Sequence, residues 1–162
     1  HLPALTEAVM SGRVRGLVAL GENPLDAGIR PGSLDGLDAF VSVALLPDPS
    51  TPYATTLLPG AGWAEKRGSM INVRGRIQRL NRAIDPPGEA RDDWEILRDL
   101  LVALGETGVP GSLDALFARM AAEIPALAGL TLERIGDLGV PVLDAGTPGA
   151  PAPPGSTADH RG

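Results

Sequence analysis

The chain has 162 residues, of which 43% are hydrophobic, and a formal net charge of −6. This length suits one domain with an aliphatic core, and the negative charge argues against general nucleic-acid binding. The lack of cysteine excludes disulfides, thiolate metal sites and cysteine nucleophiles, and the two histidines, His1 and His160, lie too near the ends for a histidine dyad inside the fold.

The first third of the chain shows short apolar segments separated by turns. Helical spacing of Leu5, Val9 and Met10 predicts a helix near the start. Three continuous apolar runs then predict short buried strands, at residues 17–20, 38–46 and 56–58. Strands of this kind are typical of a parallel sheet. We therefore predict the α/β class, with a partial Rossmann-like parallel sheet and flanking helices. We expect this sheet to be a fragment of a larger one.

The short motif GENP follows the first predicted strand. Ligands in open α/β sheets bind just past the carboxyl ends of strands, where a glycine such as Gly21 frees backbone N–H groups. Asn23 could bond a ligand, or it could satisfy its own turn before Pro24. Neither a GxGxxG nor a GxxxxGK[ST] motif occurs, so the sequence lacks a standard dinucleotide or P-loop signature.

Residues 68–80 alternate partially between apolar and polar side chains. They predict a β-hairpin excursion that turns at Asn72–Gly75. Gly68 and Gly75 would allow a positive φ and a close approach of the backbone.

The positive charges of the chain gather in and around this hairpin. Residues 65–82 carry a local charge of +5, which leaves −11 on the rest of the chain. Arg74 and Arg76, if both on a strand, would share one face and could grip a phosphate or carboxylate, whereas Glu65 and Lys66 could pair with each other or bracket a polar group. A solvated hairpin held by salt bridges, or a docking face for an acidic partner, would give the same pattern.

Two amphipathic helices follow. The first is predicted to begin with Asp92 or Asp93 as its cap, with an apolar stripe led by Trp94. The other members of that stripe are Leu97, Leu100, Leu101 and Leu104. The second helix is predicted after the cap Ser112. We expect an α/β segment over residues 1–143 and a disordered tail over the Pro/Gly/Ala-rich residues 144–162.

The order of three motifs is more specific than any one of them. GENP at 21–24 is followed by AEKRGSMINVRGR at 64–76 and PPGEARDDWEIL at 86–97. This order resembles the molybdopterin oxidoreductase superfamily over residues 13–143, and within it the large iron–sulfur (G) subunit of NADH:quinone oxidoreductase, respiratory complex I. The resemblance assigns vestigial pterin-site positions to Gly21, Asn23, Glu65, Lys66, Gly68, Asn72, Gly75 and Arg76.

This resemblance implies a C-terminal, structural part of the G subunit. The parent protein would pass electrons from NADH through iron–sulfur clusters to quinone, with the clusters in its upstream part and no catalytic residue, metal or cofactor in this segment. Its partners would be other peripheral-arm subunits of complex I, with no nucleic acid and no direct membrane insertion. Its place would be cytoplasmic, peripheral to the inner face of the plasma membrane.

Two alternatives stay open. The chain could be a fragment of a formate dehydrogenase-like enzyme that contributes to the pterin-dinucleotide site, in which case molybdopterin would be the cofactor. It could also be a stand-alone anion-binding α/β module. Active members of the superfamily often carry N-[TE]-E-G-R where this chain has NVRGR, so Arg74 occupies an acidic position. This exchange, and the lack of the family's C-terminal β-barrel, favour the complex I reading.

Overall fold

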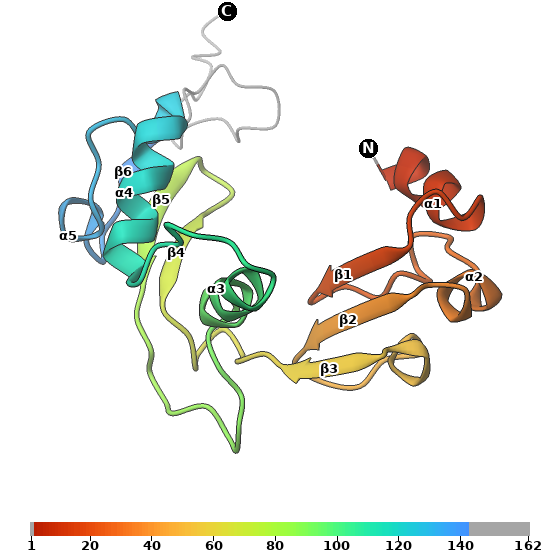
Figure 1. The fold of residues 1–162 in the computed structure, drawn as a ribbon. Coiled ribbons are helices and arrows are strands. Elements are labelled where there is room, and N and C mark those ends of the chain that lie inside the picture. Colours follow the sequence, from red (N-terminus) through yellow and green to blue (C-terminus); the bar gives the residue numbers. More distant parts are fainter. Residues whose placement is uncertain (1, 143–162) are drawn as a thin grey trace, which may run out of the picture. The chain divides into compact units, whose positions relative to one another are not determined.

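A computed structural model describes residues 2–142 (Figure 1). The chain divides into two compact units. Of the described residues, unit 1 contains those up to Lys66 together with Arg82–Gly105, and unit 2 contains Arg67–Asn81 together with residues 106–142. The expected tail, residues 144–162, lies outside the described residues, and the 1–143 segment boundary stays a prediction.

Unit 1 contains a parallel sheet of three strands in the order β1-β2-β3. The strands are β1 (Gly16–Leu20), β2 (Ala39–Ala44) and β3 (Thr56–Pro59). Their register pairs Leu17 with Phe40 and Ser42 with Leu57. The predicted parallel α/β sheet is confirmed, and each apolar run of the sequence gives one strand.

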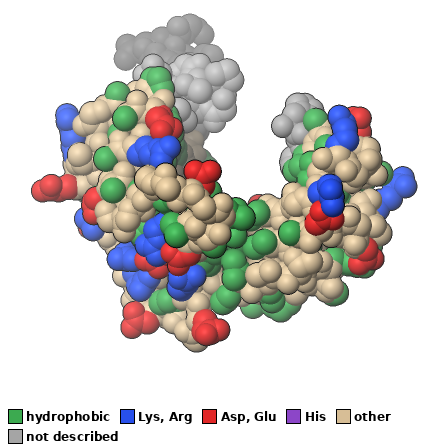
Figure 2. Space-filling model, viewed as in Figure 1, with side chains coloured by type: hydrophobic (Ala, Val, Ile, Leu, Met, Phe, Trp, Pro, Cys, Tyr) green, Lys and Arg blue, Asp and Glu red, His purple; other side chains and the backbone are tan. Residues whose placement is uncertain are grey.

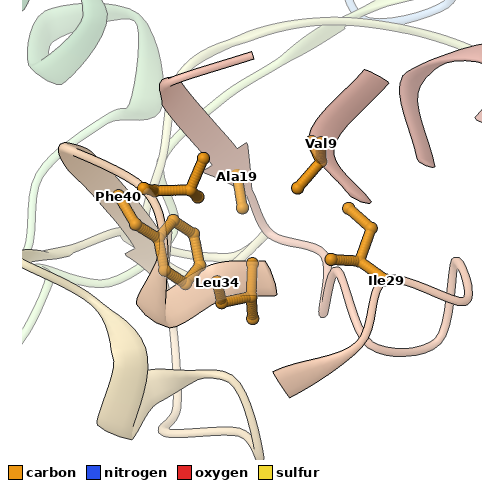
Figure 3. Packing of buried hydrophobic residues seen from close by; sticks show 6 residues of the cluster. Val9, Ala19, Ile29, Leu34 and Phe40 are labelled. Carbon is orange, nitrogen blue, oxygen red and sulfur yellow. The ribbon is translucent and has the colours of Figure 1, made fainter. Parts of the chain in front are cut away.

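One face of this sheet is covered by short helices. These are α1 (Leu2–Met10), α2 (Pro31–Asp35) and the 3-10 turn η1 (Thr51–Tyr53). Phe40 is fully buried, and it packs in one cluster with Val9 of α1 and Leu34 of α2 (Figure 3). Pro31 suits the first position of α2 because its fixed φ is helical and its missing N–H needs no partner there.

The other face of β1 is open in the described part of the chain. Val18 and Leu20 keep 47% and 42% of their surface exposed, whereas Val43 of the central strand keeps 1%. Parallel strands are ordinarily covered on both faces. This exposure accords with the expectation that the sheet is a piece of a larger one.

The helix after the proline-rich lead-in, α3, spans Asp93–Ala103. Its buried residue is Ile96, whereas Leu101 and Leu104 are 43% and 73% exposed and Trp94 is half-buried. The predicted apolar stripe was therefore wrong in part. The start of the helix lies against the end of β3 and the loop after it: Arg91 N donates to the Pro59 carbonyl at 3.2 Å, and Gly60 lies close to Asp93. The side chains of the last turn stay exposed.

Unit 2 contains an antiparallel sheet in the order β4-β5-β6. The strands are β4 (Gly68–Ile71), β5 (Arg76–Leu80) and β6 (Val140–Pro141). β4 and β5 form the predicted hairpin, with Gly68 opposite Leu80. Its turn is closed by Asn72 N, which donates to the Arg76 carbonyl at 2.9 Å, and Gly75 has a φ of 70°.

The helices of unit 2 pack on this sheet through β5. They are α4 (Leu113–Glu123), η2 (Pro125–Leu127) and α5 (Leu132–Ile135). Ile77 of β5 and Phe117 of α4 are both 2% exposed and belong to one cluster. Ser112 caps α4 as predicted, because its hydroxyl accepts a hydrogen bond from Ala115 N at 3.2 Å. Among the helices of residues 2–142, none has the length and apolar character to cross a bilayer.

Candidate functional site

The GENP loop leaves the carboxyl end of β1 through a glycine with positive φ. Gly21 has a φ of 68°, and its own N–H donates to the Val43 carbonyl at 2.8 Å. Asn23 Oδ1 accepts a hydrogen bond from Leu25 N at 3.1 Å, so the amide oxygen satisfies its own turn. Within residues 2–142 the Asn23 Nδ2 and the N–H groups of Glu22 and Asn23 have no hydrogen-bond partner.

The loop after β3 is held by its own charged side chains. Glu65 Oε2 accepts a hydrogen bond from Gly62 N at 2.7 Å. Lys66 Nζ lies 2.6 Å from Asp93 Oδ2, at the start of α3. Of the two alternatives that the sequence left open, Glu65 and Lys66 therefore do not pair with each other, and each binds a group of unit 1 instead.

A second ion pair lies beside this one, and the sequence did not predict it. Arg82 Nη2 lies 3.1 Å from Asp92 Oδ1, and the Asp92 side chain is fully buried. Asp92 occupies the N-cap position, but its carboxylate makes no capping bond, so the predicted side-chain cap was wrong. Its backbone carbonyl accepts from Glu95 N at 2.9 Å, which starts the helix while the carboxylate binds Arg82. The signal in the sequence was the pair of consecutive aspartates after a basic segment.

A network of charges continues along α3. Asp99 lies 2.7 Å from both Arg91 Nη1 and Arg98 Nη2. The hydrogen bonds from Arg91 and then Arg98 lower the pKa of the Asp99 carboxyl. Arg98 also lies 5.3 Å from the centre of the Trp94 ring. Basic and acidic side chains intermingle around this helix in the space-filling view (Figure 2). This arrangement neutralises charge within the helix surface.

A groove of about 510 Å³ runs beside the end of β3 in unit 1. It is lined by Leu58, Pro59, Gly88, Glu89, Ala90, Arg91 and Ile96. Residues 88–91 thus form one wall, and the end of β3 together with Ile96 of α3 forms another. None of the eight predicted site residues lines it.

The hairpin of unit 2 presents one arginine in a defined geometry. Arg76 Nε donates to the Leu138 carbonyl at 2.8 Å, and its two Nη atoms have no partner within the described residues. Arg74 lies in the turn, where its N–H donates to Asn72 Oδ1 at 2.9 Å. The prediction that Arg74 and Arg76 share a strand face was therefore wrong, because only Arg76 belongs to β5.

Asn72 organises this turn. Its Oδ1 also accepts from Arg76 N at 3.2 Å, and its Nδ2 donates to Gln78 Oε1 at 3.0 Å. Gly75 needs its positive φ at this point, whereas Gly68 begins β4 without one. Asn72 and Gly75 thus hold the backbone at Arg76, and Gly68 offers no more than a small side chain.

The predicted site residues fall in both units. Unit 1 holds Gly21, Asn23, Glu65 and Lys66, and unit 2 holds Gly68, Asn72, Gly75 and Arg76. Two of the loops keep free hydrogen-bond donors: the GENP loop through backbone and amide N–H groups, and the hairpin through the Arg76 guanidinium. Donors of this kind suit phosphate or carboxylate oxygens.

Comparison with known proteins defines the class. Residues 6–103, more than half of the chain, match the family model described as molybdopterin oxidoreductase. The chain belongs to the molybdopterin oxidoreductase family. Acetylene hydratase from Pelobacter acetylenicus has a similar fold, with a TM-score of 0.55 and 24% identity over 64% of this chain and 16% of that one.

Similar proteins with a named activity narrow the comparison within this family. The chain is 34% identical over 147 residues to the F420-dependent formate dehydrogenase 1 subunit alpha of Methanococcus maripaludis, which is 86% of this chain and 22% of that subunit. It is 33% identical over 106 residues to the assimilatory nitrate reductase catalytic subunit of Bacillus subtilis, which is 63% of this chain and 15% of that subunit. The chain thus spans about a fifth of the length of these relatives.

These relatives overturn one expectation from the sequence. The prediction of a complex I G subunit that passes electrons to quinone was wrong, because the similar proteins are formate dehydrogenase alpha subunits and a nitrate reductase. The motifs that suggested it lie mainly within residues 6–103, which match the model of the whole family.

Proposed function

We propose that this chain is part of a molybdopterin-dependent oxidoreductase of the formate dehydrogenase type and supplies loops that contact the pterin-dinucleotide cofactor. The similarity to formate dehydrogenase alpha subunits over 86% of the chain carries the proposal. When bound, such a cofactor supplies the metal centre at which the substrate is oxidised or reduced. The residues of this chain then bind and orient the cofactor.

Each of the two loops, taken by itself, has free donors that fit oxygens of such a group. The N–H groups of Glu22 and Asn23, together with Asn23 Nδ2, would hold cofactor oxygens at the carboxyl end of β1. The Arg76 guanidinium would pair with a phosphate or a carboxylate. Glu65 and Lys66 take supporting roles in this proposal, because their side chains already bind Gly62 N and Asp93.

The cofactor proposal is tested on the full-length protein that contains this chain. We expect the purified protein to release a pterin that fluoresces after oxidation. We also expect elemental analysis to find molybdenum or tungsten. Both amounts should correspond to about one bound cofactor per protein. Formate oxidation with an artificial electron acceptor tests the substrate class. A folded, purified protein without pterin, from cells that make the cofactor, would contradict the proposal.

The role of Arg76 has a matched control on the same strand. Arg76→Ala is expected to lower kcat/KM or the pterin content at least about tenfold, roughly 1.4 kcal/mol, because a charge-assisted contact is lost. Arg79→Ala removes an exposed arginine three residues along and is expected to leave both unchanged. Equal loss in the two variants would show that general charge, and no specific contact, is responsible.

A further inference from the structure

The path of the chain between the two units passes through two basic residues. Lys66 is the last residue of unit 1 before the chain leaves it, and Arg82 is the first residue after it returns. The segment between them, Arg67–Asn81, belongs to unit 2 and carries β4, β5 and Arg76. Whatever holds Lys66 and Arg82 therefore holds both ends of the hairpin segment.

Two consecutive carboxylates hold these residues. Lys66 Nζ lies 2.6 Å from Asp93 Oδ2, and Arg82 Nη2 lies 3.1 Å from Asp92 Oδ1. The side chains of Lys66, Asp93 and Arg82 are 28–29% exposed, and that of Asp92 is fully buried. These pairs are more shielded from solvent than the other ion pairs of α3, which involve exposed groups.

Backbone contacts support the same arrangement. The N–H groups of Ala83 and Ile84 donate to the Ala64 carbonyl, at 2.8 Å and 3.2 Å. The backbone of Gly60 lies close to the Asp93 carboxylate, so that a Cβ at position 60 would be 3.0 Å from Asp93 Oδ1. The two crossing points of the chain are thus fixed next to each other at the start of α3.

We propose that Asp92 and Asp93 are positioning residues, which clamp the two ends of the hairpin segment next to each other and so stabilise the pairing of β4 with β5 on which Arg76 lies. A buried carboxylate contributes little net stability when paired and is costly when its partner is lost, so such a pair specifies one arrangement more than it strengthens the fold. The clamp fixes the spacing of Lys66 and Arg82, next to the first pair of the hairpin, Gly68 and Leu80. The link to activity rests on the proposed function, whereas the clamp itself does not.

Hydrogen–deuterium exchange of the full-length protein, without added substrate, tests the clamp. In Asp93→Asn we expect the amides of residues 69–80 to exchange at least about tenfold faster, while those of β1–β3 keep their rates. Lys66→Met breaks the same pair without altering α3 and is expected to give the same pattern. Asp99→Asn, which removes an exposed carboxylate from the same helix, is the matched control and is expected to leave the hairpin unchanged.

Reversing the charges of the Lys66–Asp93 pair distinguishes a specific effect of this ion pair from a general loss of stability. Lys66→Glu combined with Asp93→Lys reverses the pair and is expected to return hairpin exchange to within about threefold of the parent. Unchanged hairpin exchange in Asp93→Asn and Lys66→Met would overturn the proposal, and so would an equal rise in β1–β3.

Activity forms an independent readout. In a protein that contains pterin, Asp93→Asn should retain the cofactor and lose kcat/KM about tenfold, with Asp99→Asn unaffected. Retained kcat/KM would overturn the link between the clamp and Arg76. A protein without pterin would overturn the proposed function alone, since the exchange result depends on no cofactor.

Discussion

At the scale of single residues, the charged side chains around α3 bind mainly one another. Lys66, Arg82 and Arg91 each have a carboxylate partner at 2.6–3.1 Å. The cationic segment of the sequence is therefore partly neutralised by the helix that follows it. The Arg76 Nη atoms, by contrast, have no partner within the described residues. This contrast separates residues that support the fold from a residue that is available to a ligand.

Asp99 gives a prediction on the pH dependence of stability. Its folded-state pKa is lowered, first by the hydrogen bond from Arg91. The ionised carboxylate therefore stabilises the folded state at pH values above the ordinary pKa of about 3.9. This contribution is lost as pH falls through the lowered pKa, and Asp99→Asn never has it. Urea melts from about pH 7 to about pH 3 should show the parent and Asp99→Asn converging below about pH 4. A gap that widens at low pH would contradict the assignment.

Two glycines separate backbone conformation from close packing. Gly139 and Gly129 have φ values of 71° and 73°, but a Cβ on Gly139 would stand 2.3 Å from the Ile77 carbonyl oxygen, whereas Gly129 has open space. Gly129→Ala should cost about 1 kcal/mol for its left-handed backbone, and Gly139→Ala should cost at least about 2 kcal/mol more because backbone must move. Chemical denaturation of both variants measures the difference. Equal costs would show that β6 moves away from β5 without penalty.

At the scale of elements, α3 has one buried residue near its start, Ile96, and an exposed last turn. Ile96→Ala removes its buried side chain and is expected to lower the free energy of unfolding of unit 1 by about 2–5 kcal/mol. Leu101→Ala, on the exposed end of the same helix, should change it by less than about 0.5 kcal/mol. Urea melts followed by tryptophan fluorescence compare the two. Equal effects would mean that the part of the chain beyond residue 142, or another protein, covers Leu101.

Elements with a local signal could be predicted from the sequence. Apolar runs gave the three parallel strands, the Asn72–Gly75 turn gave the hairpin, and Ser112 gave the start of α4. Each depends on residues close together along the chain. The same holds for the loops at the strand ends, which the sequence placed through Gly21 and Gly75.

Features that depend on distant residues could not be predicted in this way. The Asp92 carboxylate binds Arg82, ten positions earlier, and does not cap α3. Lys66 binds Asp93, which lies 27 positions later in the chain. The buried side of α3 depends on which turn reaches the loop after β3, which periodicity does not reveal. Arg74, by contrast, lies within the Asn72–Gly75 turn that the sequence itself predicted, so the sequence already argued against a strand face shared with Arg76.

At the scale of the whole molecule, the two units can be followed separately. Both tryptophans, Trp63 and Trp94, lie in unit 1, so tryptophan fluorescence reports on that unit. Phe117→Ala should destabilise unit 2 by about 3–5 kcal/mol because Phe117 is 2% exposed in its core. We expect the fluorescence melt to keep its midpoint while the melt followed by far-UV circular dichroism gains an earlier transition. A shift of both by the same amount would show one cooperative unit.

The discontinuity of unit 2 has a consequence for synthesis. The described residues of unit 1 have all been made once the ribosome has added Gly105, but β5 receives its second neighbour, β6, only at Val140–Pro141. During this interval the hairpin has its local pairing between β4 and β5 but lacks both β6 and the helix that buries Ile77. Nascent chains of which residues up to about 105 have left the ribosome, while later residues are still inside it, should therefore hold a protease-resistant unit 1 and a hairpin with an uncovered apolar face, a surface of the kind that chaperones recognise.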